Sequence, residues 1–216
     1  PAPVGRGAPL IPPPPPRESL GPPRTGLPPP APPPPPRRRG APPPPAPPPA
    51  RFAAVGGEAG ALGFPVEAPI SLPDGGRASR FQRGRISWSA DTGAWELLHE
   101  IAPKYEALGA ETGSLGYPVA ADTEVGDGRG RFARFQGGRI SWSPQTGVHV
   151  VTGPILERYL ELSAEAGTLG YPVSDERYLR DSPFKRFGSP PRREVDFERG
   201  TLSYDERTGV VLVAPA

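Results

Sequence analysis

A short motif that recurs at a nearly constant interval constrains the fold of this chain more than any other feature. Leucine, glycine, an aromatic residue and proline follow one another at residues 62–65, 115–118 and 169–172, so the motifs lie 53 and 54 residues apart. A second block keeps step with them at residues 81–88, 135–142 and 197–204, and reads Phe-Gln-x-Gly-x-Ile-Ser-Trp in its first two copies. Two motifs repeated in register predict a tandem array of three units, each about 54 residues long.

The second block predicts a β-hairpin in each unit. With Arg83-Gly84 as the turn, the glycine accepts the positive φ that tight turns require, and Phe81 faces Ile86. Trp88 then shares the face of Ile86, because side chains alternate along a strand. A third short strand follows a Thr-Gly pair at residues 94–97, 148–151 and 210–213. Each unit is therefore expected to hold a small antiparallel meander of three strands.

A helix is expected between consecutive meanders. At residues 154–162 the proline stands where a first helical turn tolerates it, and an apolar stripe recurs at helical spacing. Residues 101–108 repeat this pattern, whereas the prolines before residue 50 leave the first unit one helical turn at most. We expect an α+β fold whose units, at about 51–97, 98–151 and 152–214, pack side by side around shared apolar seams. The array either stays open or closes into a ring by pairing its two ends.

Residues 1–50 differ in composition from the rest of the chain. They hold 25 of the 37 prolines and almost no aromatic residue, so they cannot build a core. Proline fixes φ near the polyproline II value, and such a spacer would be extended over roughly 150 Å. We therefore expect a disordered proline-rich arm at residues 1–50 and a repeat domain at residues 51–216.

Charge and composition exclude several classes of protein. The arm carries six arginines against one glutamate, while the remaining residues have a net charge of −3, a division that does not indicate nucleic-acid binding. The chain has no cysteine, which excludes disulfides and thiol catalysis and suits export. It has no run of 18 apolar residues, so we expect no transmembrane segment. Because it also lacks methionine, we expect a processed product from which a signal peptide or an upstream catalytic domain has been removed.

The two motifs, their order and their period resemble the LGFP repeat family. The resemblance covers roughly residues 52–213, and the third copy departs from it, with Tyr204 for tryptophan and Glu198 for glutamine. Members of that family occur in exported proteins of mycolic-acid-containing actinobacteria, at the C-terminus of mycolyltransferases and in peptidoglycan amidases, where the repeats are thought to anchor proteins to the cell wall. The resemblance therefore implies a secreted, cell-wall-associated binding module, and it supplies no catalytic residue.

Two sets of residues are candidates for binding a wall polymer. The polar face of each hairpin offers planar amide and guanidinium groups suited to hydroxyl-rich or carboxylate-bearing polymers: Arg80, Gln82 and Arg85, then Arg134, Gln136 and Arg139. The aromatic residues Trp88, Trp142 and Tyr204 could form a stacking platform, although packing in the core is the favoured interpretation. Glu58, Glu111 and Glu165 also recur at the repeat period, and could cap a helix or pair with arginine across a seam.

No catalytic constellation is apparent in the sequence. His99 and His149 occupy non-equivalent positions, so no repeated metal site is expected, and no cofactor motif is present. We therefore expect a non-catalytic module that binds arabinogalactan or peptidoglycan. Two alternatives remain: an extracellular protein–protein scaffold, with the proline-rich arm as ligand for a protein partner, or the targeting half of a larger cell-wall hydrolase or acyltransferase.

Overall fold

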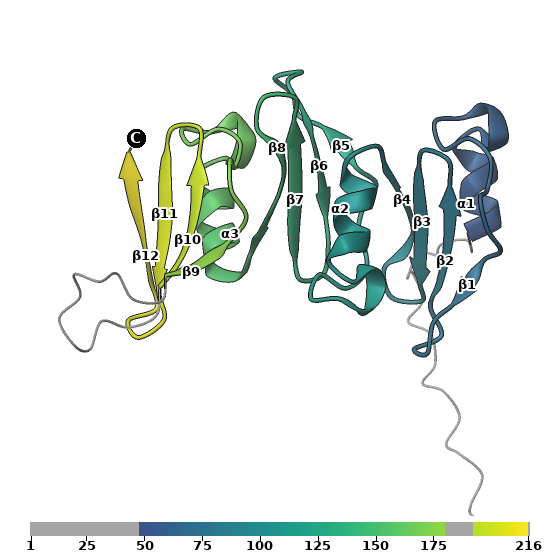
Figure 1. The fold of residues 1–216 in the computed structure, drawn as a ribbon, viewed down its shortest axis with the longest axis horizontal. Helices are drawn as coiled ribbons and strands as arrows, with labels where there is room; N and C mark the ends of the chain where they lie inside the picture. The colour runs from purple at the N-terminus through teal and green to yellow at the C-terminus, as the bar shows by residue number, and fades with distance from the viewer. Residues whose placement is uncertain (1–47, 180–191, 216) are drawn as a thin grey trace, which may run out of the picture. The chain divides into compact units, whose positions relative to one another are not determined.

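The computed structural model describes residues 48–179 and 192–215, which combine helices with antiparallel sheets (Figure 1). The proline-rich arm expected at residues 1–50 lies outside the described residues except for its last three, which begin a helix. Three α-helices are described: α1 (Pro48–Ala54), α2 (Ile101–Ala107) and α3 (Gly153–Glu161). A short 3-10 helix follows each of them: η1 (Gly57–Ala59), η2 (Ala110–Thr112) and η3 (Ala164–Ala166).

Each unit contributes a four-stranded antiparallel sheet. The strands of the first sheet are β1 (Ile70–Ser71), β2 (Arg77–Phe81), β3 (Gly84–Ser89) and β4 (Gly93–Leu98). The second sheet holds β5 (Thr123–Glu124), β6 (Arg131–Arg134), β7 (Gly138–Ser143) and β8 (Gly147–Thr152). The third holds β9 (Arg177–Leu179), β10 (Arg192–Phe197), β11 (Gly200–Asp205) and β12 (Val210–Pro215). The expected meander is thus present with one additional edge strand per unit.

The hairpin turn lies one residue earlier than the sequence predicts. Phe81 pairs with Gly84 and Ser79 with Ile86, so the turn residues are Gln82 and Arg83. The prediction of Arg83-Gly84 as the turn is therefore wrong. Gly84 does not lie in the left-handed region; a Cβ at this position would lie 2.2 Å from the carbonyl oxygen of Leu97 on the neighbouring strand. The glycine is required by the close approach of two strands rather than by the turn.

The helices begin and end close to the predicted residues in the second and third units. Gly109, which follows the end of α2, has φ 91° and lies in the left-handed conformation that glycine adopts without strain. The first helix is longer than the single turn expected, because α1 runs over seven residues and includes Pro48 and Pro49. Proline is tolerated in a first helical turn, where its missing N–H would have no partner within the helix.

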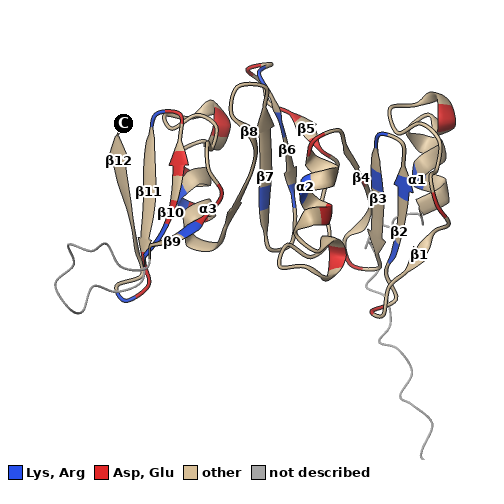
Figure 2. Cartoon of the chain, viewed as in Figure 1, with Lys and Arg blue, Asp and Glu red and all other residues tan. Residues whose placement is uncertain are grey.

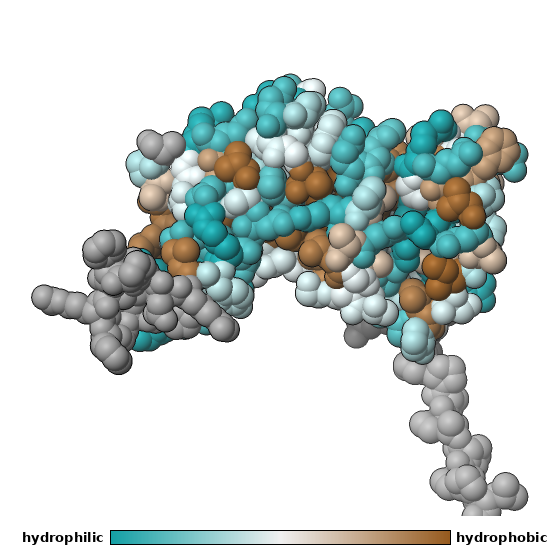
Figure 3. Space-filling model, in the orientation of Figure 1, coloured by the Kyte–Doolittle hydropathy of each residue, from teal (hydrophilic) through white to brown (hydrophobic). Residues whose placement is uncertain are grey.

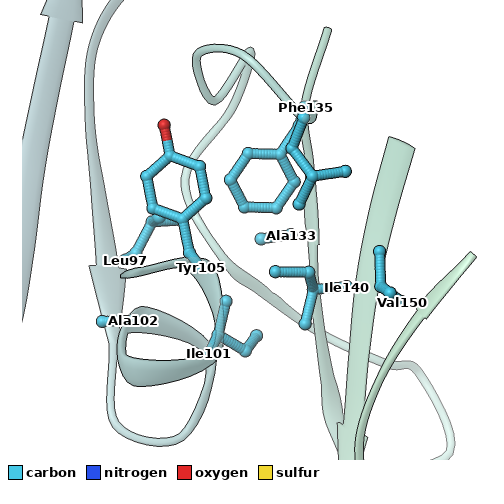
Figure 4. Packing of buried hydrophobic residues seen from close by; sticks show 9 residues of the cluster. Leu97, Ile101, Ala102, Tyr105, Ala133, Phe135, Ile140 and Val150 are labelled. Atoms are coloured by element: carbon cyan, nitrogen blue, oxygen red, sulfur yellow. The ribbon is translucent and has the colours of Figure 1, made fainter. Parts of the chain in front are cut away.

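The core is divided among the seams between helices and sheets. The cluster around α2 joins Leu97 from the first sheet, Ile101 and Tyr105 from the helix, and Phe135 and Ile140 from the second unit. Figure 4 shows the ring of Tyr105 lying beside that of Phe135, and their centroids are 4.7 Å apart. The cluster around α3 repeats the arrangement with Val151 contributed by the second sheet. Each of these helices therefore packs against two sheets, as expected of units that share apolar seams. The unit boundaries and closure into a ring remain predictions.

Candidate functional site

A buried ion pair crosses each seam next to the apolar cluster. Both oxygens of the Glu111 carboxylate accept hydrogen bonds from the guanidinium of Arg85, and the distance from Nε of Arg85 to Oε1 of Glu111 is 2.8 Å. The hydroxyl of Ser87 donates a hydrogen bond to the same carboxylate. Arg85 is 5% exposed and Glu111 6% exposed. Burial disfavours the charged guanidinium, but the hydrogen bonds and charges of Glu111 and Glu106 outweigh that effect and raise the pKa of Arg85.

The second seam repeats this contact. Arg139 donates from Nε to Glu165 at 2.8 Å and from a second nitrogen, and Ser141 donates to the same carboxylate. Arg139 also lies over the ring of Phe132, with its Cζ 3.6 Å from the centroid. The expectation that the recurring glutamates pair with arginine across a seam is confirmed for Glu111 and Glu165. Arg85 and Arg139 were predicted as ligand-binding residues on the polar face of a hairpin, but the following unit covers them and buries both side chains.

The glutamine of the second block holds the turn of the first motif. Oε1 of Gln136 accepts a hydrogen bond from the backbone N–H of Tyr117 at 2.9 Å, and Oε1 of Gln82 accepts one from Phe64 at 3.2 Å. Glu198 does the same for Tyr171 at 3.1 Å. The side-chain oxygens of Gln82 and Gln136 therefore have a structural role within the unit, although both residues are exposed.

A second hydrogen bond across each seam involves the aromatic residue of the first motif. The hydroxyl of Tyr117 donates to Asp74, in the loop before β2 of the first unit, at 2.8 Å, and Tyr171 donates to Asp127 at 2.9 Å. The amide of Gly76 and this hydroxyl lower the pKa of Asp74. In the first unit the equivalent residue is Phe64, which has no hydroxyl and is 54% exposed. The aromatic residue of the first motif therefore bridges a seam in the second and third units and not in the first.

The aromatic residues of the second block lie against the core. Trp88 packs against the cluster that contains Ile86 and Phe81, and Trp142 packs against the α2 cluster. Tyr204 packs against the α3 cluster, and the guanidinium of Arg193 lies 4.9 Å from its ring centroid. All three are half-buried. Their contacts agree with the favoured interpretation of core packing.

A groove opens to solvent where the first hairpin meets α2. It has a volume of about 370 Å³, and we call it the seam groove. Its lining residues include Arg80, Gln82, Arg83, His99, Pro103 and Glu106. Two of the residues singled out from the sequence, Arg80 and Gln82, thus lie together in one groove. Arg134 and Gln136 are exposed at the equivalent positions of the second unit.

Hydrogen bonds fix the two guanidinium groups of the seam groove. Nε of Arg80 donates to Glu106 at 2.9 Å, while Arg83 donates to the carbonyl oxygens of Ala61 and Gly60, both at 2.7 Å. The terminal nitrogens of Arg80 have no partner within residues 48–179 and 192–215. The groove therefore presents oriented N–H donors to an incoming ligand. Such donors suit carboxylates and hydroxyl groups.

The described part of the chain contains no group of three histidine, aspartate or glutamate residues that could hold a metal ion. Among the same residues, no helix has the length and hydropathy to cross a membrane.

Comparison with known families identifies two copies of a repeat. The family model of the LGFP repeat matches residues 62–113 and residues 115–167. The third copy of the two motifs, at residues 169–172 and 197–204, has Glu198 and Tyr204 in place of glutamine and tryptophan and lies outside these matches. A search of curated proteins finds no match.

Proposed function

Two copies of the LGFP repeat are identified in this chain, and from that premise we propose that it is a non-catalytic module that attaches an exported protein to the cell wall by binding a wall polymer in the seam groove. Association with the cell wall agrees with the family. The groove is the observation that supports a specific site, because the hairpin of one unit and the helix of the next together line it.

The charges in the groove favour a ligand that carries carboxylates. Arg80 and Arg83 bring two guanidinium groups to the groove, and Glu106 already accepts hydrogen bonds from Arg80 and Arg85. The short peptides of peptidoglycan offer free carboxylates, whereas the sugars of arabinogalactan offer hydroxyl groups. A charge-assisted hydrogen bond is roughly twice as strong as a neutral one. We therefore propose peptidoglycan as the polymer and keep arabinogalactan as the alternative that the experiment below separates.

The surface drawn in Figure 3 is compatible with a polar ligand. On the face drawn in Figure 3, small apolar patches are separated by polar residues. Carbohydrate binding commonly relies on many weak polar contacts, and repeated sites on one chain multiply the effective affinity. Arg134 and Gln136 would supply such a second contact in the following unit.

Co-sedimentation with insoluble actinobacterial cell walls tests the proposal. The protein is mixed with purified walls before and after removal of arabinogalactan, and the bound fraction is measured over a range of protein concentrations. Binding that persists without arabinogalactan supports peptidoglycan, whereas binding that disappears with it identifies arabinogalactan as the ligand. Failure to sediment with either preparation contradicts an anchoring role.

Arginine variants locate the site. Arg80→Ala and Arg83→Ala, separately and together, are expected to weaken wall binding by about tenfold or more, because each loses a hydrogen bond of roughly 1.5–3 kcal/mol to a charged group. The matched control is Arg77→Ala with Arg207→Ala, which removes the same charge from two other exposed positions. Melting temperatures verify folding. Equal losses in the groove and control variants would show that net charge, rather than the groove, governs binding.

A further inference from the structure

The first unit exposes a carboxylate whose two counterparts are buried. Glu58 occupies in η1 the position that Glu111 occupies in η2 and Glu165 in η3. Those two glutamates each accept hydrogen bonds from an arginine and a serine of the preceding sheet. Glu58 is exposed and has no partner within the described residues.

The backbone around Glu58 already has the geometry of the occupied positions. The residue before each 3-10 helix is left-handed, with φ 96° at Gly56 and 91° at Gly109. The residue after it is extended, with φ −76° at Gly60 and −78° at Gly113. Glu58 is therefore held in the conformation that accepts an arginine and a serine in the other units, and little reorganisation is needed for binding.

An apolar hollow of about 230 Å³ accompanies Glu58 on the first unit. Its lining residues include Pro48, Phe52, Pro65, Pro69 and Phe81. In the second unit, the end of strand β4 from the preceding sheet fills the corresponding place. Leu97 joins the cluster of Ile101 and Tyr105, and the backbone amide of Leu98 donates a hydrogen bond to Asp122 at 3.2 Å. The first unit thus retains an apolar recess where the other units receive a strand.

We propose that this face of the first unit docks the terminal sheet of a different protein chain, one that carries an Arg-x-Ser sequence on its central strand as Arg85-Ile86-Ser87 and Arg139-Ile140-Ser141 do here. The arginine and serine would donate to Glu58, and the last strand of the partner would enter the apolar recess. The two occupied seams of this molecule show both contacts, so the partner is defined by the chemistry of an LGFP-type sheet. This interaction is independent of polymer binding in the seam groove.

The third sheet of a second copy does not meet this requirement. In the first sheet, Arg85 pairs with Arg80 and Ser87 pairs with Ala78. At the same places in the third sheet, Thr201 pairs with Asp196 and Ser203 pairs with Glu194. The hydroxyl of Thr201 donates to Asp196 at 2.8 Å, and that of Ser203 donates to Glu194. By register, Asp196 on β10 stands where β2 has Arg80 and β6 has Arg134 (Figure 2). Both carboxylates already pair with Arg177 on β9. A glutamate arriving at this sheet would meet these two carboxylates and no arginine at the position of Arg85, so self-association end to end is disfavoured.

A donor variant of the full chain tests the docking site. Thr201→Arg, Glu194→Ala and Asp196→Arg give the third sheet the residues that the first sheet carries, and Glu58→Ala in the same chain removes its own acceptor. Mixed with the unchanged protein, this donor is expected to form a 1:1 complex in sedimentation velocity experiments. With Glu58→Ala as the acceptor, the complex is expected to weaken by at least tenfold.

Three outcomes would overturn the proposal. A folded donor that forms no complex at high concentration shows that Glu58 and the recess do not accept such a sheet, and equal binding by the Glu58→Ala acceptor shows that the contact lies elsewhere. A marked drop in the melting temperature of Glu58→Ala alone shows that another part of this chain already occupies the site. If the donor does not fold, Thr201→Arg with Asp196→Ala provides a milder donor with the same expected result. Wall binding by the Glu58→Ala variant is expected to be unchanged, so failure here is distinguishable from failure of the proposed polymer site.

Discussion

At the scale of single residues, the two repeated motifs are halves of one contact. The glycine of the first motif has φ of 64–72° in all three units, at Gly63, Gly116 and Gly170. A Cβ on Gly116 would lie 2.6 Å from Oε1 of Gln136, the atom that accepts the N–H of Tyr117. The glutamine and the glycine are therefore required together, which explains why the two blocks recur together.

A comparison of two glycine substitutions isolates this contact. Gly116 and Gly128 have nearly the same φ, 64° and 66°, but nothing lies within 4 Å of a Cβ on Gly128. Both alanine variants lose about 1–2 kcal/mol because of the left-handed backbone. Gly116→Ala is expected to lose roughly 1–3 kcal/mol more, since it also disrupts the hydrogen bond to Tyr117. Urea denaturation measures the difference, and in a Gln136→Ala background the difference is expected to shrink. Equal losses in the two variants would contradict the coupling.

At the scale of elements, the 3-10 helix after each α-helix fixes how the helix meets the preceding sheet. Removing one member of a buried ion pair leaves its partner charged and without compensation, which costs about 3–5 kcal/mol. Glu165→Ala is expected to lose an amount in this range, because Glu165 is the only carboxylate paired with Arg139 within the described residues. Glu111→Ala is expected to lose less, since Arg85 keeps Glu106 at 3.2 Å. The same substitution at the exposed Glu58 provides the control and is expected to change the free energy of unfolding little. Any other order of the three variants in urea denaturation would contradict this account.

The sequence predicted where the helices and long strands lie better than it predicted which residues pack against their faces. Apolar periodicity located α2, α3 and the long strands, because each buries one face. The two-residue strands β1 and β5 were missed, since a strand that short has no periodic pattern. The polar faces of β3 and β7 were interpreted as surfaces for a ligand, because alternation along a strand separates two faces without identifying what covers them. The glutamates that recur at the repeat period were the sequence signal for the residues that cover these faces. They were expected to cap a helix or to pair with arginine across a seam, but Arg85 and Arg139 were not identified as their partners.

At the scale of the whole molecule, the repeat defined by sequence and the packing unit are out of phase. The family model matches residues 62–113 and 115–167, and each match holds both the arginine of a sheet and the glutamate that covers it. The boundaries expected from the sequence, at residues 97 and 151, instead cut each seam between its two partners. Each match thus encloses the ion pair of one seam, whereas the apolar cluster of that seam extends beyond the match, for example to Phe135 and Ile140 around α2, and stability in such arrays depends on contacts between neighbours.

Two truncations distinguish these choices of unit. A chain that ends at residue 167 keeps α3 and η3 and therefore keeps Glu165 with Arg139, whereas a chain that ends at residue 152 leaves Arg139 on the sheet with no carboxylate from the next unit. We expect the longer fragment to have the higher melting temperature, although it leaves Ile155 and Tyr159 without the third sheet that buries them in the full chain. Arg139→Thr in the shorter fragment is expected to recover part of the difference, because Thr201 is the residue that the molecule itself places at this position in its last sheet. If the substitution has no effect, the unpaired arginine is not the cause of the instability, and the apolar cover that α3 provides over Val151 becomes the governing contact.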